Sequence, residues 1–417
     1  MSPTSAAVRT SNYTTLLAAG ASLFAALGMV FFPLEVFSAS TQGIWLWWEV
    51  VLPSILPFLI IAEIMIGLGI LDFLGALLEP LMRPLFNLPG SAAFVVAMGF
   101  TSGFPVGAYL TGRLRSAGHC SRLEGERLLS FTNNASPLFM LAAVPIGMLG
   151  MPALGVYLAA VNYGVSLLIG ILFRFYGSGQ PSPVSWRGGT IGYGRGALQA
   201  LLSGRRKDGR PLGRLMGDAV RTSVISISVI GGFIVFFSVL IRLLGVLGVW
   251  GGLVRFMQAA LGGQVPAGVL EGVNTGIWEM TLGCQAVSAS AAPTAIKIAL
   301  VGFILGWAGL AIHAQVVSMI ADTDLRYGPF ILSRLLHGTL SAVILYLGFH
   351  LNLFDPMQPV AALAAPGPAV DWFTYLTWSL KLTGGTLAVL LLLALGCGAL
   401  KAGRPTPAYH TRRPWSS

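Results

Sequence analysis

Residues 91–112 read SAAFVVAMGFTSGFPVGAYLTG, a segment that could form either a spanning helix or a hairpin. The segment is apolar enough to enter a membrane. Its repeated glycines and its proline would break a straight helix, because proline lacks the backbone donor and glycine weakens helices. We therefore predict a re-entrant hairpin around a Gly-Pro turn, with an ordinary Gly-rich span as the alternative. The breaking residues are Gly99, Gly103, Pro105, Gly107 and Gly112.

A second segment of the same character lies at 266–290, PAGVLEGVNTGIWEMTLGCQAVSAS. Broken backbone at membrane depth is tolerated only where protein or a water-filled cavity satisfies its polar groups. We predict a second hairpin here, with the same alternative. The interrupting residues are Glu271, Asn274, Gly276, Glu279, Thr281 and Gly283.

The composition of the whole chain is that of an integral membrane protein. Of 417 residues, 55% are hydrophobic and 10% are charged, and the mean hydropathy is +0.78. Soluble proteins carry about 25% charged residues, so too few charges remain here to cover a water-facing surface. We predict an all-α polytopic membrane protein with about eight transmembrane helices, each of roughly 20 apolar residues, plus the two hairpins. The expected spans are 13–33, 44–71, 122–148, 152–176, 222–247, 295–320, 329–350 and 372–400.

Basic residues gather in connections that this count places on one side of the membrane. The segment 174–221 and the C-terminal tail are rich in Arg, whereas the connections 34–43 and 352–371 contain no Lys or Arg. Cationic loops stay in the cytoplasm. We therefore expect a multi-pass protein of the bacterial cytoplasmic membrane with both termini inside. Topology explains the net charge of +10, and no nucleic-acid partner is expected.

The same order of segments occurs in two halves of the sequence. Each half has a lead helix, a short amphipathic stretch, a hairpin, a broken span and a further span. The two lead helices run in opposite directions through the predicted membrane, which predicts an inverted-topology repeat typical of secondary transporters. The predicted units are 1–43 (N-terminal helix), 44–176 (first repeat), 177–221 (basic linker), 222–350 (second repeat) and 351–417 (C-terminal helix and tail).

Small polar residues interrupt the broken span of the first half, RLLSFTNNASP at 127–137. An unpaired polar group in hydrocarbon costs several kcal/mol, so these side chains need partners. We predict that Asn133, Asn134 and Ser136 line a solute site, because Pro137 and the paired amides indicate a break. Helix–helix hydrogen bonding is the alternative.

In the second half, GWAGLAIHAQ at 306–315 places His313 and Gln315 in the matching broken span. Histidine is the side chain best suited to relay a proton near neutral pH, although a membrane histidine also serves as a cross-helix hydrogen bonder. A carboxylate in a membrane is a functional candidate by default. Glu279, accompanied by Asn274 and Thr281, is therefore a further candidate. Glu63 fits a functional role and a structural pairing equally well.

The sequence lacks the motifs of the common enzyme classes. HExxH, GxxxxGK[ST] and GxSxG are absent, so we expect no enzyme and no direct ATP drive. The three cysteines are far apart without CxxC spacing, so neither a zinc site nor a disulfide framework is expected. No cofactor or metal is predicted.

Three of these segments together resemble one known family. They are GFTSGFPVGAYLTGRL (99–114), SRLEGERLLSFTNNASPLF (121–139) and GWAGLAIHAQVVSMIADTDLRYGPFILSRLLHG (306–338). They are similar to the YlbJ-type sporulation integral membrane proteins of the nucleoside-recognition, or Gate, family, over about residues 40–350.

The resemblance implies hairpins and broken helices like those of concentrative nucleoside transporters. It also implies a link to endospore formation and to movement of dipicolinic acid, a planar dicarboxylate, across the outer forespore membrane. The cavity positions that it implies are the hairpin tip at Gly103 and Pro105, the Asn133–Asn134 pair, Glu279, His313 and Gln315.

The function predicted from residues and resemblance together is transport of a small polar or anionic solute. Dipicolinate during sporulation is the leading substrate. A nucleoside-type permease and a non-transporting sporulation assembly protein are the alternatives. The expected partners are the lipid bilayer and the solute, while a coupling ion and a homo-oligomer remain open.

Overall fold

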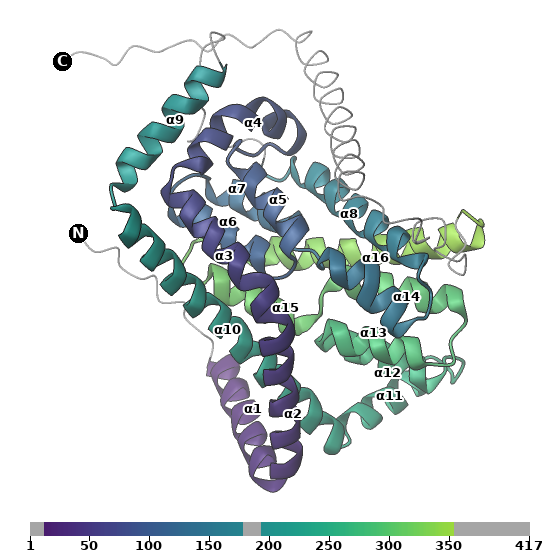
Figure 1. Ribbon diagram of the computed structural model, residues 1–417. Helices are drawn as coiled ribbons and strands as arrows, with labels where there is room; N and C mark the ends of the chain where they lie inside the picture. The colour runs from purple at the N-terminus through teal and green to yellow at the C-terminus, as the bar shows by residue number, and fades with distance from the viewer. Residues whose placement is uncertain (1–11, 178–192, 354–417) are drawn as a thin grey trace, which may run out of the picture.

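The computed structural model describes residues 12–177 and 193–353, and within these ranges all regular secondary structure is helical (Figure 1). The first part contains ten helical segments in chain order. They are α1 (Asn12–Phe31), α2 (Pro33–Leu46), a π-helix (Trp47–Val51), α3 (Leu52–Gly67), α4 (Ile70–Phe86), α5 (Ala92–Ser102), α6 (Val106–Ser116), α7 (Arg122–Phe131), a second π-helix (Phe139–Met148) and α8 (Leu154–Phe173).

The remainder repeats most of this order after the connecting helix α9. The segments are α9 (Tyr193–Asp208), α10 (Leu212–Val246), α11 (Val249–Ala260), α12 (Ala267–Trp278), α13 (Met280–Ala289), α14 (Thr294–Trp307), α15 (Gly309–Ile320) and α16 (Gly328–His350). In both parts a long helix bends at a glycine in the left-handed region, Gly69 (φ 79°) or Gly248 (φ 73°). A shorter helix, a helical pair, a broken helix and a further helix follow each bend.

The two long helices run antiparallel against each other. α2, the first π-helix and α3 continue without a break over residues 33–67 and pack along α10. Glu35 pairs with Arg242, and the Trp47 indole donates to the Ile227 carbonyl at 3.0 Å, so rising numbers on one helix meet falling numbers on the other. This antiparallel packing is what an inverted repeat predicts.

The helical pairs α5–α6 and α12–α13 are hairpins, as the sequence predicted. Their helices have 10 to 12 residues, or about 15–18 Å at 1.5 Å per residue, too short to cross a hydrocarbon layer of about 30 Å. The backbones of α12 and α13 pack closely against each other at two glycines. A Cβ on Gly283 would lie 2.2 Å from the Gly276 Cα. Glycine is therefore required for this close approach.

The spans agree in part with the expected eight. Within the described residues, four helices are long and apolar enough to cross a membrane, or up to six if each bent pair counts as one span. The expected span 372–400 lies outside the described residues, and 122–148 is divided into α7 and the second π-helix.

The expected outer connection at 34–43 is helical instead. Pro33 begins α2 directly after α1, at the position where its missing N–H costs nothing. Polar Glu35 gains a partner in Arg242 of α10, so the absence of basic residues in this segment did not mark a loop.

Candidate functional site

The tip of the first hairpin sits on the break of the first broken helix. α5 and α6 are joined by Gly103, Phe104 and Pro105, and the break is the non-helical stretch 133–136. A Cβ on Gly103 would lie 2.9 Å from the Ser136 Cβ, so only glycine, here at φ +84°, allows this approach. The structure thus brings Gly103 and Ser136 together, and Pro105 belongs to the same turn.

The predicted amides of this break are buried and hydrogen-bonded. The Asn133 Oδ1 accepts from the Ala108 backbone N–H at 2.8 Å, which binds the break to the start of α6. The Asn134 Oδ1 accepts from the Ser166 hydroxyl of α8 at 2.9 Å, and its Nδ2 donates to the Phe131 carbonyl. Both asparagines are fully buried, so these amides hold three elements together in this closed arrangement.

The second half repeats this junction with different residues. Between α12 and α13, Glu279 accepts from the backbone N–H of Thr281 (3.0 Å) and of Leu282 (2.7 Å), so its carboxylate caps α13. The break between α14 and α15 has two successive left-handed residues, Ala308 (φ 74°) and Gly309 (φ 75°). A Cβ on Gly309 would lie 2.9 Å from the Met280 backbone nitrogen, so this tip also sits on its own break.

The two tips and the two breaks meet in one apolar cluster. Phe104 of the first tip and Met280 of the second tip are buried in the same cluster as Ala135 and Ala308, one residue from each break. Interrupted backbone from both halves therefore converges inside the bundle, although the segments are distant in the sequence.

Three further predicted residues of the second half are buried nearby. His313 of α15 donates from Nε2 to the Trp307 carbonyl at 2.9 Å, because a carbonyl can only accept, and its Nδ1 accepts from the Tyr327 hydroxyl. Gln315 is 2% exposed, and Asn274 of α12 is 3% exposed, with its Nδ2 unpartnered. His313 is thus fully hydrogen-bonded, whereas Asn274 retains a free donor.

Sequence reasoning missed the polar residues of α16. The Arg334 guanidinium is fully buried and donates to the carbonyls of Asn133 (2.6 Å) and Ser130 (2.7 Å), next to the first break. One turn later, His337 donates from Nε2 to the Asn162 carbonyl of α8 at 2.9 Å. The signal was present in the sequence, since an arginine inside the predicted span 329–350 is a functional candidate by default.

Comparisons with known proteins agree with this architecture. The family described as Gate, nucleoside recognition, matches residues 48–164, which cover the tip and break of the first half. The chain is 40% identical over 407 residues to the sporulation integral membrane protein YlbJ of Bacillus subtilis (strain 168), covering 90% of this chain and 98% of that protein. This chain belongs to the YlbJ family. No solved structure matches it. As a YlbJ-family member it is an integral membrane protein.

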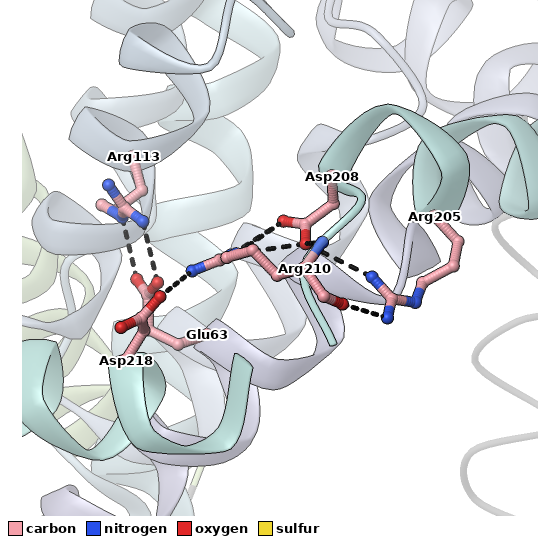
Figure 2. A network of polar contacts seen from close by, with 6 residues as sticks. All are labelled: Glu63, Arg113, Arg205, Asp208, Arg210 and Asp218. Atoms are coloured by element: carbon pink, nitrogen blue, oxygen red, sulfur yellow. Dashed lines mark hydrogen bonds and ion pairs between the residues drawn. The ribbon is translucent and has the colours of Figure 1, made fainter. Parts of the chain in front are cut away.

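Among the described residues, one end of this YlbJ-family bundle carries most of the ion pairs. We call it the basic end (α4, α6, α7, α9, the end of α3, the start of α10 and the turn 321–327). The Glu63 carboxylate of α3 accepts hydrogen bonds from Nε and one Nη of Arg113, both at 2.8 Å. It also accepts from the Tyr109 hydroxyl at 2.6 Å. Glu63 is thus a structural partner of a cation. Figure 2 shows this pair beside a second network, in which Arg210 reaches between Asp208 and Asp218.

Two ion pairs at the basic end join the halves of the YlbJ-family chain. Arg115 at the end of α6 binds Asp324 through two hydrogen bonds of 2.7 and 2.9 Å. Glu126 of α7, fully buried, accepts from Arg326 at 2.8 and 3.0 Å. The bond from Arg115 holds the pKa of Asp324, which lies outside the spans, below its ordinary value of 3.8. The turn 321–327 is thereby fastened to the first half.

Proposed function

We propose that this chain is a secondary carrier that moves a small polar or anionic solute across the membrane. The observation that carries this proposal is the convergence of two hairpin tips and two helix breaks in one buried cluster. In transporters, broken helices of this kind expose unpaired backbone groups to a solute near the midplane. The predicted residues of both junctions would line this site, and their closed packing would correspond to an occluded state.

Alternating access would open the site by separating the two halves. The ion pairs of the turn 321–327 hold the halves together at the basic end. By the positive-inside rule, the basic end would face the cytoplasm, and we propose the same side for both termini. The inward-open state would therefore require release of Asp324 and Arg326 from the first half.

Dipicolinate is the substrate that we propose first. The relative in Bacillus subtilis is named a sporulation integral membrane protein. The family resemblance described above implies movement of this dicarboxylate across the outer forespore membrane. The Gate match, described as nucleoside recognition, favours a nucleoside-type permease as the second candidate. A non-transporting assembly protein is the third, favoured by the complete hydrogen bonding of Asn133 and Asn134.

Flux through reconstituted vesicles tests the proposal. Purified protein in proteoliposomes is given dipicolinate or uridine, and uptake is followed against protein-free vesicles. Carrier function predicts saturable uptake of one of them. The double variant Asn133→Ala with Asn134→Ala should lose that uptake while remaining folded.

The matched control for this double variant is Ser228→Ala. The exposed Ser228 hydroxyl donates to the Val224 carbonyl of its own helix, and Ser228 belongs to neither hairpin and neither break, so uptake should persist. Unchanged uptake in the folded double variant would exclude the proposed site. Absence of uptake of either solute by the wild type would favour the assembly protein.

A further inference from the structure

Arg334 is a buried cation without an acidic partner. Its side chain is fully buried, six residues inside α16, and none of the ion pairs among the described residues includes it. Two peptide carbonyls and the ring of Phe330, 5.5 Å from the guanidinium carbon, are its contacts. Dipoles offset only part of the cost of burying a full charge, so this site favours an anion.

Unpartnered polar atoms gather around the same place. In the described residues, eight buried side-chain nitrogen and oxygen atoms lack a hydrogen-bond partner, and five of them belong to α8 and α16. These helices are packed together, with the His337 imidazole bonded to the Asn162 backbone. The five atoms are Arg334 Nε, Asn162 Nδ2, Asn162 Oδ1, His337 Nδ1 and Ser341 Oγ.

Spacing along α16 places three of these residues on one face. Arg334, His337 and Ser341 are three and then four positions apart, so they form a stripe along one side of the helix. Buried polar groups in proteins are almost always hydrogen-bonded. A stripe of unpaired polar atoms that includes a buried positive charge therefore indicates a binding site rather than ordinary packing.

We propose that Arg334, Asn162 and Ser341 form a carboxylate-binding centre between α8 and α16, and this inference rests on the proposed carrier function. The N–H of Arg334 Nε and the Asn162 amide donate to the oxygens of one charged carboxylate. Ser341 lies seven positions, or about 10 Å, farther along α16, so its hydroxyl meets a second polar group of the solute. The acceptors Asn162 Oδ1 and His337 Nδ1 suit a hydrogen-bond donor on the same solute. The solute class is thus a small organic acid with one charged carboxylate and one proton-bearing group, as in the monoprotonated form of dipicolinate.

The position of this centre links binding to the first break. The guanidinium that binds the carboxylate also holds the carbonyls of Asn133 and Ser130. A solute that draws on the charge of Arg334 weakens those two bonds. Binding is thereby coupled to the backbone break on which the first hairpin rests.

Affinity measurements on the full chain in nanodiscs test the assignment. The probes are dipicolinate, its neutral diamide (pyridine-2,6-dicarboxamide) and uridine. Wild-type protein should bind dipicolinate more tightly than the diamide. Arg334→Gln should weaken dipicolinate binding about 10- to 100-fold, the value of a charged hydrogen bond, and should abolish the preference over the diamide.

Arg127 provides the matched control. It is likewise a buried arginine that donates to two backbone carbonyls, those of Tyr176 and Asn87, but it lies at the basic end. Arg127→Gln should lower thermal stability and leave the ratio of dipicolinate to diamide affinity unchanged. If both variants lose that ratio equally, Arg334 acts only through stability and the centre is refuted.

Variants that leave the charge in place keep the test decisive if Arg334→Gln does not fold. Asn162→Ala and Ser341→Ala should each weaken dipicolinate binding about 3- to 10-fold. Unchanged affinity in both overturns the centre. Wild-type protein that binds uridine but no carboxylate also overturns it and leaves the carrier intact, whereas binding of no probe, together with no flux, refutes the carrier itself.

Discussion

Replacement of Gly107 by alanine should separate the first hairpin from the helix break beneath it. A Cβ at this position would lie 2.2 Å from the Thr132 carbonyl oxygen and 2.7 Å from its carbon. Ordinary contacts begin near 3.4 Å, so the hairpin must retreat by roughly 1 Å, a strain of about 1–3 kcal/mol. That retreat also lengthens the 2.8 Å bond from Ala108 to Asn133, whose loss inside the bundle costs about 1–3 kcal/mol.

Gly107→Ala should therefore lower the free energy of unfolding by about 2–6 kcal/mol, combining the strain and the lost bond. Unfolding in mixed micelles of increasing denaturing detergent gives this quantity. The control is Gly164→Ala on α8, where a Cβ would meet no atom within 4 Å, and its stability should match the wild type. Equal unfolding curves for the two variants would show that the hairpin does not rest on Thr132 as described.

Three further predictions concern other contacts. Glu63→Gln should lower stability by about 1–3 kcal/mol, because the partly exposed Arg113 cation loses its carboxylate partner. Adding Arg113→Gln should restore part of the loss in the same unfolding assay, and a double variant less stable than the single variant would contradict the pairing. Gly283→Ala should push α13 away from α12, since its Cβ would lie 2.2 Å from the α12 backbone, and should abolish solute uptake in vesicles, whereas normal uptake would argue against the tight hairpin. The Arg115 bond lowers the pKa of Asp324, so its contribution is present above pH 3.8 and is lost as the pH falls further. Asp324→Asn should remove that part of the acid sensitivity, at most about 1 kcal/mol for an exposed pair, and an unchanged pH profile would exclude the bond.

The sequence predicted those parts of the site that depend on backbone breaks. Glycine and proline made both hairpins and the first break predictable from the sequence, because few other residues permit such turns. The partners of the buried polar groups were not predictable, since Arg334 binds peptide carbonyls, which every residue possesses. Nor was the helical course of 34–43, because Glu35 obtains its counter-charge from Arg242, more than 200 positions away. Local patterns thus reveal where the chain bends, while long-range packing decides what each side chain meets.

The charge-free stretch of α10 matches the thickness of a bilayer. Arg221 and Arg242 are 21 positions apart on α10, or about 32 Å at 1.5 Å per residue. The hydrocarbon layer is about 30 Å thick, and charged ends resist entering it. α10 can therefore cross the layer with little tilt, with Arg242 and its partner Glu35 near one surface. A thinner bilayer should force α10 and the helix paired with it to tilt, so that membrane thickness itself adjusts the angle between the two halves.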